Sequence, residues 1–252
     1  MHKLGRKPPD YTKARLWAED YFTDEALPPS KPNVDYCTEV ASWPMYMNDT
    51  LGDCTCAGIG HAIGAWSQYV AGSEATFTDN AIEALYSAVS GYIPGNESTD
   101  NGATLQSVLA YMQSTGITDT NGKNHTVQAF AQLKETTFAQ LDVALQLFGT
   151  VYLGINCPQS AEDQFEQGLW TYVKGSPILG GHCIVLQQIA NRPVGDYTII
   201  TWGAKVNATK QFMSTYLEEA WVPLSPDWLN AQGDTITGLD VAQLTTDMQA
   251  LA

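Results

Sequence analysis

The sequence contains five cysteines and four histidines, the residue types that most often supply a nucleophile and its base. Cys54 follows the loop 48–53 and begins a run, 54–70, whose apolar residues on nearly every side predict a buried helix. A thiol at a helix N-terminus feels the positive end of the helix dipole, which favours the thiolate. Asp53 is a candidate N-cap whose own charge acts in the opposite direction. Cys54 is therefore the first candidate nucleophile, although the position alone equally allows a buried, inert cysteine.

His182 is the better candidate for the base. It lies in Gly180-Gly181-His182, at the start of a predicted strand in the other half of the chain. His61 lies seven residues after Cys54, on the same face of the same predicted helix but about 10 Å along its axis, which is too far for a direct hydrogen bond. A lone strand histidine is more often a core residue, so the pairing of His182 with Cys54 remains a hypothesis at this stage.

The helix and the strand that must position Cys54 and His182 lie in two halves of the chain with different predicted secondary structure. The first half is mostly helical, whereas the second half contains short apolar runs rich in β-branched residues, which predicts an α+β domain with two lobes. Helices are predicted over 54–70, 80–90, 103–115, 137–148, 208–220 and 239–251. Strands are predicted over 150–155, 182–189, 197–202 and 221–224, with a hairpin turn at 191–196. Residues 1–32 read as an extended arm with one short helix near 12–22, ending in a proline-rich run.

Charge and composition limit the partners. The net charge is −15, with 44% hydrophobic and 15% charged residues, so a large core is expected while nucleic acids and anionic membranes are poor partners. No segment approaches the ~18 apolar residues of a membrane span, and the first ten residues lack the apolar core of a secretory signal, so we expect a cytoplasmic protein. The basic residues gather early, and we expect a solvated tail, with docking on an acidic neighbour as the alternative. They are Lys3, Arg6, Lys7, Lys13 and Arg15.

The cysteine count argues for free thiols. An odd number of cysteines without a secretory leader does not suggest a disulfide framework. Cys54-x-Cys56 together with His182-Cys183 could be considered as metal ligands, but a one-residue gap is an awkward chelate for zinc. We expect neither a metal nor a cofactor.

Several short motifs occur in an order that resembles the papain-like cysteine peptidases. Six features of that family have counterparts here: the opening Val-Asp-aromatic motif, the nucleophile motif in its bacterial Leu-Gly-Ser-Cys-Thr variant, the glycine-rich cleft wall, the strand before the histidine, Gly-Gly-His and the final Trp-Gly. These counterparts are Asn33-Val34-Asp35-Tyr36, Leu51-Gly52-Asp53-Cys54-Thr55, Asp100-Asn101-Gly102-Ala103-Thr104, Gly149 to Ile155, Gly180-Gly181-His182 and Thr201-Trp202-Gly203. The resemblance, to a divergent bacterial or phage-type member, covers about 33–203.

The resemblance implies a papain-like two-lobed domain over 33–252. Its helical lobe, about 48–120, carries the cysteine on a central helix. An antiparallel β-rich lobe follows at about 121–225, with the arm at 1–32 and a C-terminal helix at about 239–251. It further implies cleavage of amide bonds in a peptide or protein substrate, with Cys54 as nucleophile, His182 as base and Asn48 as a second oxyanion donor beside the Cys54 amide. Gly102, Ala103 and Thr104 would line the substrate cleft and Trp202 would shield the pair, although Thr104 fits a helix cap and Trp202 a core residue equally well.

Two departures from the family pattern weaken this reading. Asn48 is one methylene shorter than the family's glutamine, and Ile200 occupies the position of the asparagine that orients the histidine. The neighbouring Thr201 is expected to point to the opposite face of its strand and so to be a poor substitute. A second hypothesis is therefore an inactive or weakly active papain-like scaffold within a larger assembly, such as a virion. Hydrolysis, transpeptidation and deamidation all remain open, because one thioester intermediate serves all three.

Overall fold

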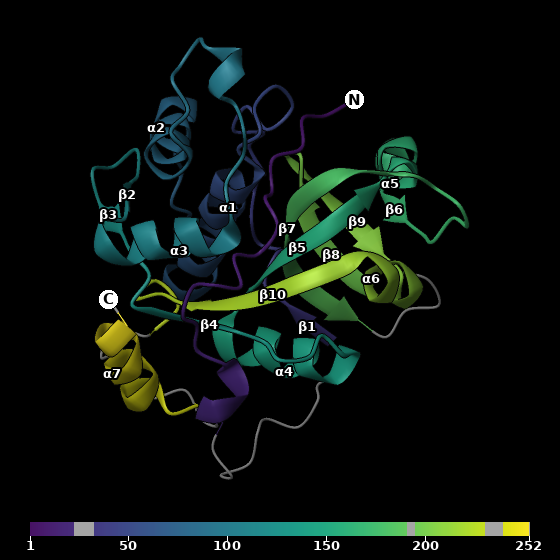
Figure 1. Cartoon of the computed structure of the whole chain (residues 1–252). Helices are drawn as coiled ribbons and strands as arrows, with labels where there is room; N and C mark the ends of the chain where they lie inside the picture. The colour runs from purple at the N-terminus through teal and green to yellow at the C-terminus, as the bar shows by residue number, and fades with distance from the viewer. Residues whose placement is uncertain (23–32, 191–194, 230–238, 252) are drawn as a thin grey trace.

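The computed structural model describes residues 1–22, 33–190, 195–229 and 239–251. The helices of the first half of the chain gather on one side of the molecule, and a twisted sheet with other helices around it forms the other side (Figure 1). The helical side is formed by α1 (Cys54–Ala71), α2 (Asp79–Ser90) and α3 (Leu105–Ser114), with a small hairpin of β2 (Ile117–Thr118) and β3 (Asn124–His125). These two sides are the two lobes of an α+β domain.

Within the described residues the other lobe is built on an eight-stranded sheet. Seven strands follow the order β4-β10-β5-β7-β8-β9-β6, and β1 pairs separately with β7. The pairings are antiparallel apart from β6 with β9, which is parallel. The strands are β1 (Asn33–Asp35), β4 (Ala129–Gln132), β5 (Val151–Pro158), β6 (Leu169–Trp170), β7 (Ile178–Ala190), β8 (Tyr197–Thr201), β9 (Ala204–Ala208) and β10 (Leu217–Leu224).

Helices begin where a threonine can cap them. The hydroxyls of Thr78, Thr104, Thr137 and Thr209 each accept a backbone N–H three residues further on, at the starts of four helices. The helices outside the first lobe are α4 (Phe138–Phe148), α5 (Gln159–Gln164), α6 (Lys210–Tyr216) and α7 (Val241–Leu251), with short 3₁₀ turns η1 (Ala18–Tyr21), η2 (Glu97–Thr99) and η3 (Phe165–Gln167).

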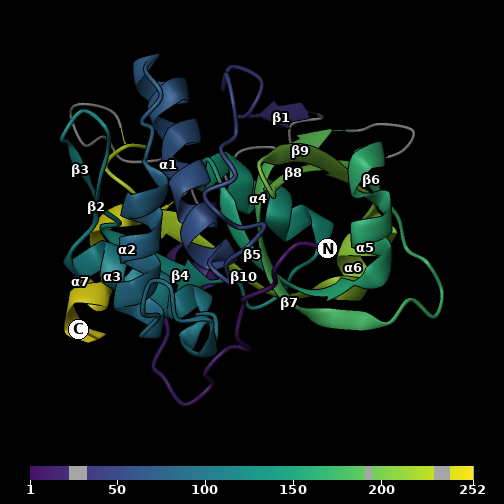
Figure 2. The same cartoon turned by 90° about the horizontal axis from the view of Figure 1, so that it is seen from above.

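Helix α1 lies between the two lobes. Every residue from 54 to 67 is buried, as the apolar sequence of this helix predicts. One flank packs on the sheet at Gly58, where a Cβ would lie 3.0 Å from Tyr152 and 3.1 Å from Cys183 Sγ. The opposite flank packs against α2. Figure 2 shows α1 between the other helices and the strands, so this helix lies where the lobes meet.

The observed elements confirm the α+β class and most of the predicted helices, with three differences. The predicted helix over 208–220 ends at Tyr216, and Leu217 begins β10 because this segment pairs with both β4 and β5. The helix predicted near 12–22 is reduced to η1, and the short helix α5 and the strands β1, β2, β3, β4, β6 and β9 were not predicted. Most of the hairpin turn predicted at 191–196 lies outside the described residues. None of the described helices has the length and apolar character needed to cross a membrane.

Candidate catalytic cleft

Cys54 is the first residue of α1 and lies at the junction of the lobes. Its side chain is 1% exposed, and all five cysteines are buried free thiols. Burial raises the pKa of Cys54 to about 12, assisted by the charge of Asp53, whereas the backbone amides of Cys183 and Gly5 and the charge of Arg6 act in the opposite direction. The sulfur is therefore a neutral thiol in this state.

His182 reaches the same junction from β7. Its ring is fully buried, and Nε2 lies 2.7 Å from Thr201 Oγ1. Trp202 stacks on the imidazole at 4.6 Å between ring centres and an angle of 26°. Nδ1 is buried without a hydrogen-bond partner. Burial, followed by the charges of His2 and Arg6, lowers the pKa of His182 to about 3, so the ring is neutral.

Thr201 corrects one expectation from the sequence. The β7–β8 register pairs Val185 with Ile200, and continuing it by one residue places Thr201 opposite Ile184. Side chains alternate along a strand, so Thr201 shares the face of Ile184 and His182. The prediction that Thr201 points away from the imidazole was wrong, because the shift in register between Leu186 and Gln188 sets which face it occupies. A hydroxyl thus takes the orienting place left by Ile200.

The Cys54 sulfur lies close to the backbone of Cys183, the residue next to His182. The amide of Cys183, the residue after His182, stabilises the Cys54 thiolate. In the described residues no hydrogen bond joins the sulfur to the imidazole. Both groups are neutral, and the residue whose amide acts on the Cys54 sulfur, Cys183, is the neighbour of His182 in β7.

The first residues of the chain occupy this junction. Residues 3–7 run between the helices and the sheet (Figure 1), bonded to both walls. Lys7 N donates to Ala103 O at 2.9 Å and Ala103 N donates to Gly5 O at 2.9 Å, which ties the segment to the helical lobe. Arg6 N donates to Gly181 O at 3.0 Å, which ties it to the sheet. We call residues 1–7 the cleft arm.

The cleft arm fits closely enough that only glycine is possible at two places. A Cβ on Gly5 would lie 1.8 Å from Gly52 O, and a Cβ on Gly102 would lie 2.0 Å from Gly5 O. His2 extends the same segment over the site, stacking on Trp202 at 4.3 Å. With the arm in this position the sulfur faces an amide N–H of Gly5, and a second peptide cannot enter.

The arm also overturns the expectation of a solvated basic tail, at least for Arg6. Its side chain is buried and forms an ion pair with Glu219, Nη1 to Oε1 at 2.9 Å, and a second with Glu218. Lys3 lies 3.3 Å from Asp100. The acidic neighbour that these cations dock on is their own domain.

Asn48, the predicted oxyanion donor, is buried close to the nucleophile. Its amide donates to Asp53 Oδ1 at 3.2 Å and to Leu51 O at 3.5 Å. Asp53 is fully buried, and burial raises its pKa well above the ordinary value. In this state the Asn48 amide is therefore directed at its own loop, and the backbone amide of Cys54 is the donor that the helix start supplies.

The residues predicted to line the cleft, Gly102, Ala103 and Thr104, lie next to the cleft arm. Gly102 has φ +74, its N–H donates to Tyr86 Oη at 2.8 Å, and Ala103 carries both backbone bonds to the arm. Thr104 caps α3, its hydroxyl accepting the Ser107 amide at 3.1 Å, so its side chain has the helix-cap role that was the alternative reading.

Sequence reasoning missed three residues around the site. Asp100 accepts the Gly52 amide and the Tyr86 hydroxyl, and so holds the loop before Cys54. Thr201 orients His182, and Glu219 receives Arg6. Asp100 could have been noticed inside its own motif, whereas Thr201 and Glu219 depend on strand register and on long-range contact.

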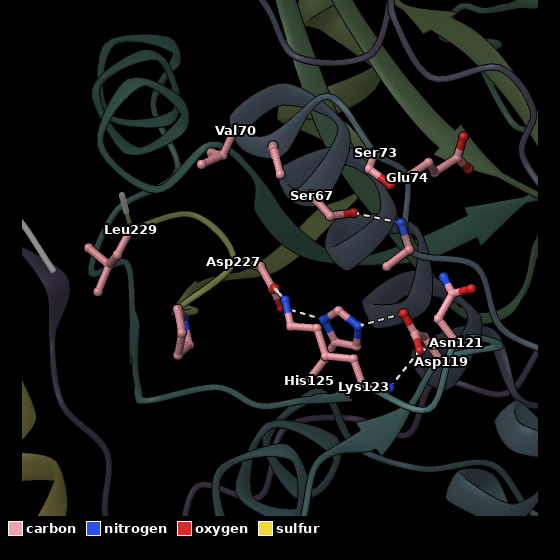
Figure 3. A pocket seen from close by; sticks show the side chains of 13 residues that line it. Ser67, Val70, Ser73, Glu74, Asp119, Asn121, Lys123, His125, Asp227 and Leu229 are labelled. Carbon is pink, nitrogen blue, oxygen red and sulfur yellow. Dashed lines mark hydrogen bonds and ion pairs between the residues drawn. The ribbon is translucent and has the colours of Figure 1, made fainter. Parts of the chain in front are cut away.

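A second hollow lies on the helical lobe, between the end of α1, the β2–β3 hairpin and the segment 226–229 (Figure 3). His125 is buried at its edge, with Nδ1 2.7 Å from Asp227 Oδ2 and Nε2 3.2 Å from Asp119 Oδ2. Lys123 lies 2.7 Å from Asp227 Oδ1. Both ring nitrogens of His125 thus have carboxylate partners. Across the described residues, no group of three or more histidine, cysteine or acidic side chains is arranged to hold a metal ion.

Comparisons with known proteins give similarity in fold. No family model and no curated protein matches the sequence. Xylellain, a cysteine protease from Xylella fastidiosa, superposes with a TM-score of 0.67 at 11% identity, covering 88% of this chain and 96% of that one. Procathepsin B S9 from Trypanosoma congolense gives 0.64 at 12%, covering 88% and 86%. Procathepsin L 3 of the Tenebrio molitor larval midgut gives 0.56 at 14%, covering 83% and 76%. The chain therefore has the papain-like cysteine protease fold.

Proposed function

We propose that this chain is a cysteine-dependent peptidase, or a related acyl transferase, that acts on amide bonds through Cys54 and His182 when the cleft arm leaves the junction. One observation supports this most strongly. His182 is held on one side by Thr201 and covered by Trp202, Nδ1 is left buried without a partner, and the amide of the next residue, Cys183, acts on the Cys54 sulfur. An imidazole nitrogen without a partner is free to accept a proton, as a general base requires.

The reaction follows from these groups. His182 Nδ1 takes the proton of the Cys54 thiol, and the thiolate attacks the carbonyl carbon of the substrate to form a tetrahedral intermediate. The oxyanion is stabilised by the amide at the start of α1 and by the helix dipole. His182 then gives the proton to the leaving amine as the C–N bond breaks. Water, or an amine in a transfer reaction, attacks the thioester carbon and releases Cys54.

The arm explains why the pair is silent in the state described. It excludes water from Cys54 and His182, and this burial is the main reason that the imidazole is neutral; the charges of His2 and Arg6 act in the same direction. Removal of the arm hydrates the junction, which raises the pKa of His182 and lowers that of Cys54. Loss of the Arg6 charge also raises the pKa of His182 but acts against the fall for Cys54, where relief of burial, the largest cause, outweighs it. A thiolate–imidazolium pair then becomes accessible.

The test uses the full chain with Gly5→Val, which forces the arm out through its clash with Gly52 while leaving Cys54 and His182 in place. A peptidyl electrophile is added near neutral pH and the adduct is located by mass. We expect rapid labelling confined to Cys54 in Gly5→Val, lost when His182→Ala is added. Lys7→Val, an exposed position in the same arm, is the matched control and should react as slowly as the unaltered chain.

Arg6→Ala provides an independent way to loosen the arm, since it removes the ion pairs with Glu218 and Glu219. It too should speed the labelling of Cys54. Uniform, slow labelling of several cysteines in both variants would contradict the proposal and leave a papain-like scaffold without catalysis.

A further inference from the structure

The Arg6 side chain fills a pocket in the sheet lobe beside the junction. Its guanidinium donates to Glu219 Oε1 at 2.9 Å, to Asn156 Oδ1 at 3.2 Å, to the Ile155 carbonyl at 3.3 Å and to Glu218. Every one of these groups is an acceptor. Two carboxylates, an amide oxygen and a backbone carbonyl therefore converge on one planar cation, from β5 and β10.

Residues outside the arm contribute to the shape of the pocket. Trp221 Nε1 donates to Glu219 Oε2 at 2.7 Å, which fixes the carboxylate from the strand beneath it. Gly154 opens the space, because a Cβ there would lie 2.7 Å from Arg6 Cδ and 2.7 Å from Glu219 Cγ. The position of the Glu219 carboxylate is thus set in part by a residue outside the arm.

The pocket is adjacent to the reacting groups. The Arg6 amide binds Gly181 O, one residue before His182, and the Arg6 charge reaches both Cys54 and His182. A side chain in this pocket consequently belongs to a peptide whose backbone passes the nucleophile.

We infer that the pocket of Glu218, Glu219, Asn156 and Gly154 is the specificity subsite for an arginine side chain of the substrate, and that Arg6 of the cleft arm is its resident occupant. The inference rests on the proposed function, because it names the substrate class of that same cleft. The arm therefore closes the cleft with the side chain that the cleft selects.

Charge and geometry both favour arginine in this pocket. Glu219 is 2% exposed with Arg6 in place, and leaving a buried carboxylate without its cation is costly. A guanidinium presents a planar set of five donors that can meet several acceptors at once, whereas an ammonium is a compact point charge. We expect arginine to be preferred over lysine, and both over a neutral side chain.

The experiment measures binding, so it needs no turnover. A fluorescent peptide with the sequence of residues 2–8 is titrated into full-chain Gly5→Val by anisotropy, and compared with the same peptide carrying citrulline or lysine in place of Arg6. Citrulline keeps the shape and removes the charge. Loss of one partner of a buried charge pair predicts on the order of 100-fold weaker binding for citrulline. Equal affinity for the arginine and citrulline peptides would overturn the inference.

A variant pair locates the effect. Glu219→Gln should reduce the preference for arginine over citrulline at least tenfold, while Glu97→Gln, an exposed carboxamide swap of the same size, should leave it unchanged. In the otherwise unaltered chain, Glu219→Gln should also free the arm and speed alkylation of Cys54. If Glu219→Gln binds the arginine peptide over the citrulline peptide as selectively as before, the subsite is wrong, even if Cys54 is reactive. If binding is selective but Cys54 is inert, only the proposed catalysis is wrong.

Discussion

His182 and His125 are both buried histidines, yet their surroundings differ in one respect. Both ring nitrogens of His125 are engaged by carboxylates, whereas His182 has one nitrogen bonded to Thr201 and the other without a partner. Burial lowers the pKa of each ring, but the hydrogen bonds and charges of Asp227 and Asp119 outweigh it for His125, whose pKa is raised. The pKa of His182 falls to about 3. A completed network stabilises the fold, and an incomplete one leaves a nitrogen available for chemistry.

The largest expected effect comes from removing the incomplete histidine. With the arm displaced by Gly5→Val, His182→Ala should slow peptide hydrolysis by about 10²–10⁴, the usual contribution of a general acid–base group. Urea unfolding monitored by tryptophan fluorescence reports whether the domain stays folded. If hydrolysis persists within a factor of two, His182 is not the base.

The next largest effect is on the free energy of unfolding and concerns His125 with its two carboxylate partners, Asp119 and Asp227. His125→Ala removes the imidazole from between Asp119 and Asp227, so each carboxylate loses a hydrogen bond, and the free energy of unfolding should fall by ~3 kcal/mol. The rate of Cys54 labelling in the Gly5→Val background should change less than twofold, because this cluster lies away from the junction. A loss of reactivity with unchanged stability would reverse the roles assigned to the two histidines.

Thr201 tests whether the one hydrogen bond of the His182 ring is needed for catalysis. Thr201→Val removes a hydrogen bond to a buried ring and should reduce kcat/KM in the Gly5→Val background by about 10- to 100-fold. Thr201 acts through His182, so the pH–rate profile should shift and Thr201→Ser should restore it. Ile200→Val, on the neighbouring position and the other face, is the control. If Ile200→Val is as damaging as Thr201→Val, the hydroxyl has no orienting role.

The pH dependence of stability separates the two environments. A raised folded-state pKa means that charged His125 adds stability that is fully present below its unfolded pKa, about 6.5, and is lost as the pH rises through the folded value. His182, with its lowered pKa, acts in the opposite direction on acidification. The difference between the unaltered chain and His125→Gln isolates His125. In urea titrations from pH 5.5 to 9 this difference should shrink as the pH rises, and a growing difference would contradict the sign.

Lys123 should matter least. Its side chain is 62% exposed beside Asp227, so Lys123→Met should lower the unfolding free energy by at most about 1 kcal/mol. A larger loss would mean that the cluster depends on the cation more than on His125.

The periodic helices and the ordered motifs were predictable from the sequence, because local patterns carry them. The cysteine-bearing helix 54–70 is observed as Cys54–Ala71 for this reason. Strand β10 was partly missed because its partners β4 and β5, and not its own residues, decide its conformation.

The rest of the site depends on contacts that no local pattern contains. Thr201 meets His182 because of a register shift at Leu186–Gln188, and a slip of one residue exchanges the two faces of a strand. Arg6 meets Glu219 across 213 residues, so a basic N-terminal segment reads as a solvated tail until the fold is known.

The central claim is that the cleft arm hides a competent nucleophile, and the pH dependence of Cys54 alkylation tests it most directly. In the unaltered chain the alkylation rate should rise only well above pH 9, towards the pKa of about 12 that burial imposes. In Gly5→Val the inflection should fall below pH 9, and His182→Ala should raise it again. An identical alkylation profile for the unaltered chain and Gly5→Val would contradict the account.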